Sequence, residues 1–312
     1  MGQAVLLGDP SFFQIRAGAN PHTRTRWGRR KKVDRTQAWL QWKELKSVLE
    51  GHGVKVWVIP AAPEQPGLVF PANAGFRFGN DFYLSNLNPA RVGEREHYRR
   101  VISSLGLTVR DFPSAVAFEG EADFIPVGDP SGDPKRAVFL FTYGRIETPR
   151  WVPRWGWPPY RRVTGFRSDR RALEPLQSIV GEREILPLEL KDEYHYHGDT
   201  VLCPFGPRQE FLLGFLEVLS SDSQAALRRR FGERLVPLGE IDGHRFAANS
   251  AQVATDYSGD RISVLLTPDG LTGSFYDRIR QRGVIPCPVD VSEFLEKGGG
   301  AVKCMLLNLG EL

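Results

Sequence analysis

The sequence has few sulfur-bearing residues and no long apolar stretch. Three cysteines and two methionines occur among 312 residues, and no two cysteines form a C-x-x-C pair. An odd number of cysteines cannot be fully paired in disulfides, so this pattern favours a reducing compartment and argues against a structural zinc site. No apolar run approaches the ~18 residues of a membrane span, and the N-terminal segment reaches Asp9 without the pattern of a signal peptide. We expect a cytoplasmic protein with no metal, no cofactor and no membrane contact.

A large excess of charge of one sign is also absent, because the formal net charge is only +4. Positive charge is concentrated locally, however, because six of the nine residues from Arg24 to Lys32 are basic, with Trp27 inside the run. A basic run with an aromatic residue can follow a phosphate backbone, but it is more often a solvated loop. Since no nucleic-acid-binding module surrounds it, the sequence favours the loop, and nucleic acid is not the expected partner.

Strand-like and helix-like segments alternate along the whole chain. With 41% hydrophobic and 25% charged residues, the composition is that of a globular protein with a large core. No shift in composition divides the chain, so we expect one α/β domain over residues 1–312. Strands are predicted at 3–7, 54–59, 137–141, 200–202, 261–267 and 303–309. Helices are predicted at 34–51, 94–105, 169–180, 221–231 and 271–282, the first with an apolar side formed by Trp39, Leu40, Trp42, Leu45, Val48 and Leu49.

One segment, near 143–163, interrupts this alternation as an insertion rich in tryptophan and proline. Within it, Thr148–Tyr160 holds three tryptophans, Trp151, Trp155 and Trp157, and four prolines. Such a segment continues neither a helix nor a central strand. A lid over a site, a contact surface for a second subunit, and a loop packed on the body of the protein all remain open. The homo-oligomer implied by the second reading therefore stays open as well.

Short glycine-rich or polar clusters recur at intervals of about 50 residues, a period that indicates repeated supersecondary units. Each unit would deliver one loop to a shared face. The clusters are 70–75, 119–123, 165–168, 197–200, 247–250 and 298–304.

These clusters contain the groups that could carry chemistry. Cys304 follows three glycines, which suits either a reactive thiol or a buried inert cysteine on a terminal strand. Glu119 and Asp123 sit between apolar flanks, as an exposed acidic turn or as carboxylates in an enclosed site. On a strand, His197 and Asp199 would share one face, with His195 on the same side. A thiol, an imidazole and carboxylates match the inventory of thiol-dependent hydrolysis.

Taken in order, five of these clusters resemble the signature segments of the guanidine-modifying enzyme superfamily, which includes arginine deiminase, dimethylarginine dimethylaminohydrolase and the amidinotransferases. They are Phe-Pro-Ala-Asn-Ala-Gly at 70–75, Glu-Gly-Glu-Ala-Asp at 119–123, Gly-Phe-Arg-Ser at 165–168, Tyr-His-Gly-Asp-Thr at 196–200 and Gly-Gly-Gly-Ala-Val-Lys-Cys at 298–304. The match spans nearly the whole chain. It implies an α/β propeller (pentein) of five ββαβ-type units around a central active-site pocket.

The resemblance also implies roles for individual residues. Cys304 matches the nucleophile, His197 the general acid/base, and Glu119 a carboxylate that engages both the histidine and the guanidinium. Asp199 matches a second carboxylate on the guanidinium, and Arg167 a residue that can hold the α-carboxylate of arginine. We expect Asp123 and Asn249 to join the substrate-binding set.

Two asparagines bear on the choice of substrate. Asn73 and the pair Asn20-Pro21 resemble the arginine dihydrolase branch, which converts arginine to ornithine, ammonia and carbon dioxide; succinylarginine dihydrolase also has the first asparagine. The chain departs from the pattern at Pro71, Gly198, Glu121 and His22, and in the insertion. We expect a hydrolase that acts on guanidino C–N bonds of arginine or a derivative through a covalent Cys304 thiouronium. An amidinotransferase and a non-catalytic propeller that binds RNA or a ribosomal partner are the alternatives.

Overall fold

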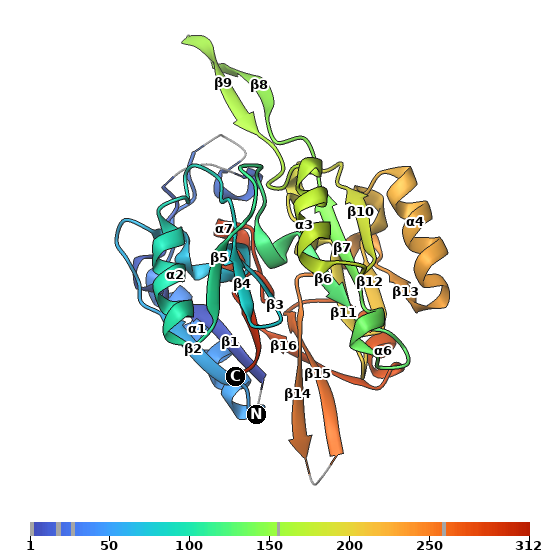
Figure 1. Cartoon of the computed structure of the whole chain (residues 1–312). Coiled ribbons are helices and arrows are strands. Elements are labelled where there is room, and N and C mark those ends of the chain that lie inside the picture. Colours follow the sequence, from blue (N-terminus) through green and yellow to red (C-terminus); the bar gives the residue numbers. More distant parts are fainter. Residues whose placement is uncertain (1–2, 17–19, 26–28, 155–156, 258–259) are drawn as a thin grey trace.

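The computed structural model describes residues 3–16, 20–25, 29–154, 157–257 and 260–312 (Figure 1). Within these residues the chain forms five three-stranded sheets and one two-stranded sheet. The three-stranded sheets are β17–β1–β2 (Leu307–Glu311, Gln3–Gly8, Lys55–Ile59), β3–β4–β5 (Gly75–Phe78, Asp81–Leu84, Thr108–Asp111), β6–β7–β10 (Phe124–Val127, Val138–Tyr143, Ile185–Glu189), β11–β12–β13 (Leu202–Phe205, Phe211–Gly214, Leu235–Pro237) and β14–β15–β16 (Ala251–Tyr257, Asp260–Pro268, Val284–Val289).

All five sheets follow one plan. The middle strand pairs antiparallel with one neighbour and parallel with the other. A parallel neighbour requires a crossover, and in each unit a helix supplies it. These helices are α1 (Arg35–Gly51), α2 (Glu94–Ser104), α3 (Leu173–Val180), α4 (Ser221–Phe231) and α6 (Gly273–Arg280), while the shorter α5 (Glu240–His244) and α7 (Ser292–Gly298) lie in connections between units. The chain thus contains five ββαβ units, and the first is completed by the last strand of the chain.

Local sequence explains these elements. The side chain of Asp34 caps α1 by accepting hydrogen bonds from the backbone N–H groups of Thr36 and Gln37. Buried residues of α1 recur at helical spacing, as the sequence predicts, but Leu40 points outward and is 56% exposed. No described helix is both long and apolar enough to span a membrane.

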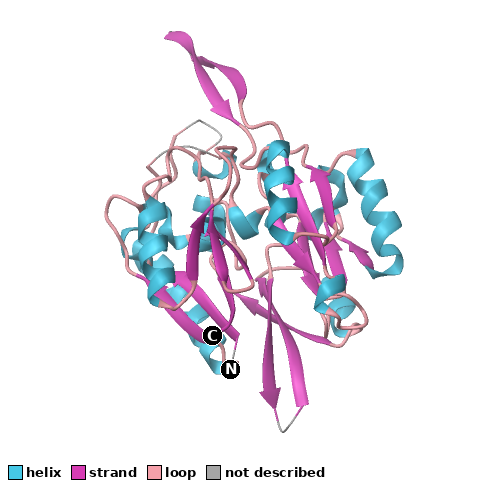
Figure 2. Cartoon of the chain, in the orientation of Figure 1, coloured by secondary structure: helices cyan, strands magenta, loops and turns pink. Residues whose placement is uncertain are grey.

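Apolar side chains pack between the sheets and the helices that cover them. Ala4 and Leu6 of β1 enter one apolar cluster, and Val5 and Leu7 enter another, so this strand is buried on both faces. Figure 2 shows helices along the outer sides of the sheets, while the hairpin of β14 and β15 extends beyond the body. The covered sheets form a rigid frame for the turns between them.

The insertion forms a separate two-stranded sheet. Strands β8 (Thr148–Arg154) and β9 (Trp157–Thr164) pair antiparallel, and the hairpin projects from the body (Figure 1). Trp151 is 69% exposed. The segment is therefore a hairpin with an exposed tryptophan, and Trp155 lies outside the described residues. In the basic run, Arg24 and Arg30 form an isolated antiparallel β-bridge. Residues 26–28 of that run, Trp27 among them, are also outside the described part.

Two predicted strands begin later than expected. The strand predicted at 200–202 is β11 at Leu202–Phe205, and the strand predicted at 303–309 is β17 at Leu307–Glu311. Residues ahead of both strands form turns, so Cys304 lies on a turn and not on a terminal strand. Side chains from neighbouring units accept hydrogen bonds from backbone N–H groups in these turns, so these groups do not pair with the adjacent strand, as described below.

Candidate active site

Each of the five units contributes one turn to a common centre. In every unit this turn immediately precedes the antiparallel outer strand. The turns are 71–74 before β3, 119–123 before β6, 197–200 before β11, 247–250 before β14 and 301–306 before β17. Five of the six clusters singled out in the sequence are thus brought together by the repetition of one unit.

Hydrogen bonds connect the turns into a closed ring. The backbone N–H of Ala72 donates to the carbonyl of Cys304 over 3.4 Å, which joins the first turn to the last. The amide nitrogen of Asn73 lies 3.3 Å from Glu119 Oε2. Further around the ring, Gly198 N donates to Asp123 Oδ1 over 2.9 Å, and Asn249 Nδ2 donates to the carbonyl of Asp199 over 3.0 Å. Contacts between Asn249 and Cys304 complete it.

The thiol of Cys304 is buried and held by two side chains. Its Sγ lies 3.2 Å from Asp199 Oδ2 and 3.2 Å from Asn249 Nδ2. Oδ1 of Asn249 accepts the backbone N–H groups of Ala301 and Cys304, at 2.7 Å and 3.2 Å, and so shapes the turn that presents the sulfur. Burial and the nearby carboxylate of Asp199 raise the pKa of the Cys304 thiol well above its usual range. Burial in turn raises the pKa of Asp199 to about 6.

The imidazole of His197 lies between two carboxylates. Nδ1 is 3.0 Å from Asp123 Oδ2, and Nε2 is 3.2 Å from Glu119 Oε2. Burial alone would lower the pKa of His197, but Asp123 and Glu119 outweigh it and raise this pKa to about 9. Burial likewise opposes the ionised form of Glu119, yet His197, Arg167 and Arg91 lower the pKa of that carboxyl to about 2. The two carboxylates therefore favour the charged imidazolium.

Asp123 is enclosed by donors. Besides Gly198 N and His197, its oxygens accept from Thr142 Oγ1 at 2.7 Å and Ser168 Oγ at 2.6 Å. The side chain is 1% exposed and does not line the pocket. Asn249 is likewise occupied by protein groups. Asp123 contacts His197, and Asn249 contacts the Cys304 turn, while the expectation that both bind substrate stays a prediction.

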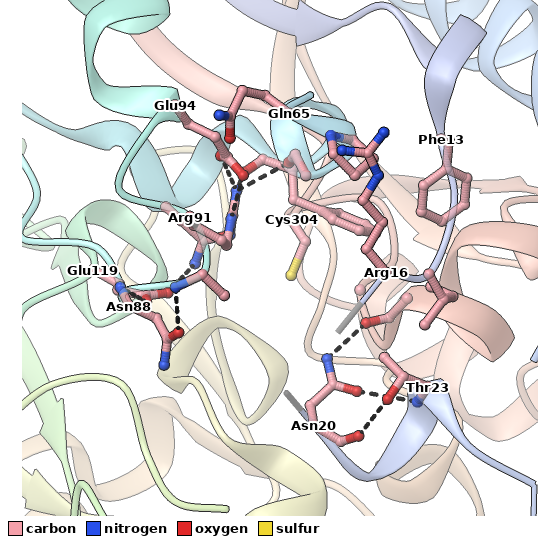
Figure 3. Close-up of a pocket in the computed structure, with 18 of the residues that line it drawn as sticks. Phe13, Arg16, Asn20, Thr23, Gln65, Asn88, Arg91, Glu94, Glu119 and Cys304 are labelled. Atoms are coloured by element: carbon pink, nitrogen blue, oxygen red, sulfur yellow. Dashed lines mark hydrogen bonds and ion pairs between the residues drawn. The ribbon is translucent and has the colours of Figure 1, made fainter. Parts of the chain in front are cut away.

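A single pocket brings the other candidates together. Its wall includes Asn20, Asn73, Glu119, Arg167, His197 and Cys304. Figure 3 shows the sulfur of Cys304 pointing into the space between Arg91 and Glu119 on one side and Asn20 on the other. Asp199 lies behind this wall, in contact with the sulfur, and its Oδ1 is buried without a hydrogen-bond partner among the described groups.

The far part of the wall comes from segments distant in sequence. Asn20 Nδ2 donates to the hydroxyl of Tyr196 over 3.1 Å and to the carbonyl of Gly298 over 2.9 Å. The guanidinium of Arg167 lies 5.1 Å from the centre of the Tyr196 ring, within the range of a cation–π contact. Gly299 has a φ of +82°, and a Cβ there would lie 2.6 Å from the His22 ring, so only glycine fits.

The histidine face expected from a strand is not formed. Residues 198–200 make a single helical turn, because Asp123 captures the Gly198 N–H and Thr200 Oγ1 donates to the His197 carbonyl. His195 points away from the pocket and stacks on Phe246 with ring centres 4.7 Å apart. Burial lowers the pKa of His195 to about 3, as expected of a neutral histidine in the core.

Sequence reasoning missed three charged side chains near the site. Arg91 and Glu94 form an ion pair on the pocket wall, with Nη2 and Oε2 2.7 Å apart. Lys303, next to the thiol in sequence, pairs with Glu121 over 2.6 Å. The spacing of Arg91 and Glu94 at i and i+3 was the available signal, and it is also the spacing of ordinary surface pairs on helices. Among the described residues, no group of three histidine, cysteine or acidic side chains is arranged to hold a metal ion.

Comparisons with known proteins agree on one family. No known family profile matches the chain. The bifunctional arginine dihydrolase/ornithine cyclodeaminase AgrE of Nostoc sp. is 30% identical over 308 residues, which is 98% of this chain and 38% of the relative. The N(G),N(G)-dimethylarginine dimethylaminohydrolase of Mycobacterium tuberculosis is 28% identical over 96% of this chain and 83% of its own length. The chain spans under two fifths of the bifunctional relatives that it matches.

Solved structures show the same fold. The N-terminal domain of ArgZ, a cyanobacterial arginine dihydrolase crystallised with its product, superposes with a TM-score of 0.81 at 24% identity, covering 100% of this chain and 98% of that domain. The repeated three-stranded units place the chain in the class of mixed α/β proteins to which this domain and dimethylarginine dimethylaminohydrolase belong. The resemblance found in the sequence is confirmed by the relatives, since the chain is similar over at least 96% of its length to arginine dihydrolases and to a dimethylarginine dimethylaminohydrolase.

Proposed function

We propose that this chain is a hydrolase of guanidino C–N bonds that acts on arginine or an arginine derivative through a covalent intermediate on Cys304. The main support is that one pocket contains a thiol and an imidazole in its wall, with Glu119 beside the imidazole and Asp199 against the sulfur. A guanidinium is a flat cation, and two carboxylates can hold it in one plane while a thiolate attacks the central carbon from above. Asp199 and Glu119 are the carboxylates that would hold it.

Binding of the cation activates the nucleophile in this mechanism. Without substrate, Asp199 and burial hold the pKa of the Cys304 thiol high. A guanidinium placed against Asp199 neutralises that charge and adds a positive one, so it favours the thiolate. The free site is then protected from unspecific oxidation or alkylation, and the thiol ionises when a substrate is present.

His197 transfers the protons in both chemical steps of this mechanism. The Cys304 thiolate attacks the guanidinium carbon, and His197 donates its Nε2 proton to the departing nitrogen, which leaves as ammonia. The remaining thiouronium is attacked by water, whose proton His197 accepts, and the C–S bond breaks to release a ureido product and the thiolate. Nδ1 of His197 keeps its proton throughout and donates it to the carboxylate of Asp123, so only Nε2 of His197 gains and loses a proton.

Asn73 and Asn20 favour the arginine dihydrolase branch within this class. An amide, unlike a carboxylate, can face a neutral ureido group, which has to be attacked a second time to give ornithine, ammonia and carbon dioxide. AgrE and ArgZ, the relatives matched over nearly the whole chain, carry that activity in their names. Arg167 lines the same pocket and is the proposed partner of the substrate's α-carboxylate.

We further infer that residues 1–312 act as one catalytic domain, an α/β propeller whose five units surround the pocket. The ring of hydrogen bonds between the five turns supports this arrangement. Its partner is a small guanidino compound, and no nucleic acid is needed for the reaction.

The test is an assay of the purified chain with arginine and with N(G),N(G)-dimethylarginine, in which ammonia, citrulline, dimethylamine and ornithine are quantified. Ornithine with two equivalents of ammonia supports the dihydrolase, and citrulline with one equivalent supports a deiminase. Glycine is added in a parallel reaction, where an amidinated glycine would reveal amidino transfer. Cys304→Ser is expected to abolish turnover, and Cys203→Ser, which alters another buried cysteine, is the matched control. Turnover that survives in Cys304→Ser would refute the mechanism.

A further inference from the structure

The basic run at 24–32 takes no part in the steps above, although it borders the pocket. Thr23, which lines the pocket wall, comes just before the run. The backbone N–H of Lys31 donates to the carbonyl of Thr23 over 2.9 Å, so the run turns back toward that wall. Nη1 of Arg30 donates to the carbonyl of Arg16 over 2.6 Å, and Arg16 also lines the pocket. The run therefore lies beside one side of the pocket.

Arg16 brings a positive charge to the pocket wall that only neutral groups hold in place. Its Nη1 donates to the backbone carbonyl of Glu64 over 3.2 Å, and its Nη2 donates to that of Pro63 over 2.5 Å. The amide of Gln14, with its oxygen turned toward the guanidinium, accepts from Nε over 3.0 Å. Figure 3 shows Arg16 on the wall opposite Glu119. Three neutral oxygens thus orient the guanidinium without cancelling its charge.

Arg16 and the four cations at 29–32 together form what we call the basic rim. Within the described part of the chain, none of these five residues has a carboxylate oxygen within 4 Å of its charged nitrogens. Nζ of Lys31 instead donates to the backbone carbonyl of Glu296 over 2.7 Å. Burial and the nearby Lys297 lower the pKa of Lys31, as expected where positive charges gather. The rim therefore carries an excess of positive charge.

The acidic side chains of the pocket wall do not offset this charge. Glu119 and Glu94 form the pairs described above. The carboxylate of Glu64 lies 3.6 Å from His97, between Oε1 and Nε2. Among the described residues of the wall, no carboxylate is left unpaired for the α-ammonium group of free arginine.

The net charge of the substrate decides how the rim acts on it. Free arginine carries a guanidinium, an ammonium and a carboxylate, so it is a cation and a basic rim repels it. An acyl group on the α-nitrogen removes the ammonium charge. A carboxylate on that acyl group then makes the whole molecule an anion, which the rim attracts.

We propose that the basic rim selects guanidino compounds of net negative charge over free arginine, so that the preferred substrate is an arginine whose α-nitrogen carries an acidic acyl group. The carboxylate of the acyl group faces the rim, while Arg167 keeps its proposed place at the α-carboxylate. Cys304 and His197 act on the guanidinium at the other end, so the chemical steps are unchanged. This inference rests on the proposed function and narrows the substrate class of the same pocket.

The experiment uses three compounds that share one guanidinium and differ in net charge. They are L-arginine, a cation, Nα-acetyl-L-arginine, which is neutral, and Nα-succinyl-L-arginine, an anion. At low ionic strength kcat/KM is expected to be highest for the succinyl compound, by at least about tenfold over arginine. Salt shortens the Debye length from about 30 Å at 0.01 M to about 8 Å at 0.15 M. Over that range kcat/KM should fall by roughly threefold to tenfold for the succinyl compound and rise for arginine.

Variants of the rim test whether its charge is the cause. Arg16→Gln is expected to lower kcat/KM for the succinyl compound by roughly fivefold to tenfold and to leave that for arginine unchanged or higher, whereas Arg16→Lys keeps the wild-type preference. The double variant Arg29→Gln/Lys32→Gln should act in the same direction, and neither of its side chains forms a hydrogen bond in the described structure, so it serves if Arg16→Gln fails to fold. Arg280→Gln is the matched control, because it removes the same charge from α6, away from the pocket wall.

Two results would overturn the proposal. One is a preference for arginine that does not change with salt. The other is an equal loss for all three compounds in Arg16→Gln, which would make Arg16 only a support for the loop at 63–64. If none of the compounds is turned over, the proposed function fails, and calorimetric binding of the three compounds to Cys304→Ser decides the role of the rim. Salt-sensitive binding that is tightest for the succinyl compound would support selection by the rim, and equal or absent binding would refute it.

Discussion

Gly198 offers a sharp test of how packing supports the candidate site. A Cβ on this residue would lie 2.2 Å from Thr142 Oγ1, 2.7 Å from its Cγ2 and 2.9 Å from its Cβ. The hydroxyl of Thr142 donates to Asp123, which in turn orients His197. In Gly198→Ala, overpacking costs about 1–3 kcal/mol. Displacement of the Thr142 hydrogen bond to a carboxylate costs about 1.5–3 kcal/mol more. We therefore expect a loss of roughly 2.5–6 kcal/mol in the free energy of unfolding, and a fall in kcat of at least about tenfold because Asp123 moves.

Urea unfolding and steady-state kinetics would measure both effects. Thr142→Ala removes two of the three clashing atoms, so the double variant should recover at least about 1 kcal/mol relative to the sum of the single variants. Gly51→Ala is the control, because a Cβ there meets nothing within 4 Å and alanine is the better helix former. A Gly198→Ala protein as stable as the wild type, or strict additivity with Thr142→Ala, would refute this reasoning.

Three further predictions concern charge, the thiol turn and the hairpin. The pKa of His197 in the folded protein, about 9, lies above its usual value of 6.5, so the stability that it contributes is present below pH 6.5 and is lost as the pH rises through 9. Urea unfolding should show a loss on the order of 3 kcal/mol across that pH window, and His197→Gln should lack this loss. Asn249→Ala leaves the buried N–H groups of Ala301 and Cys304 without their acceptor, so unfolding is expected to cost about 2–5 kcal/mol less; a wild-type unfolding curve would contradict this. Replacing residues 148–164 with a short Gly-Ser turn removes a hairpin that pairs with no other described strand, so the midpoint of thermal unfolding should move by less than about 3 °C, and a large drop would show that the hairpin packs on the body.

Much of the architecture could be predicted because it depends on patterns that a sequence displays directly. Helical spacing of apolar residues located α1, α2, α4 and α6 to within a few residues. The recurrence of polar clusters indicated repeated units, and the structure contains five of them. The family was identified from five short segments in order, and the relatives confirm it.

The local geometry of the site was harder to predict, because it depends on bonds between units. Alternation suggested that His197 and Asp199 share a strand face, but Asp123, from another unit, bends this segment into a turn. The strand expected to carry Cys304 is interrupted for a similar reason, since Asn249 takes up its backbone N–H groups. The roles assigned to these side chains remain predictions for the assays described above.

The pairing of the first strand with the last has a consequence for folding kinetics. The sheet that follows the Cys304 turn consists of β17, β1 and β2, so residues 3–8 have to remain unpaired on one edge until residues 307–311 arrive. Contacts so distant in sequence close slowly, because a long loop loses its conformational entropy before the pairing compensates for it. We therefore expect the sulfur to reach its position only in the last step of folding, when the other four turns are already assembled. Protection of β1 amides from hydrogen exchange during refolding should appear together with the enzymatic activity, and not before it.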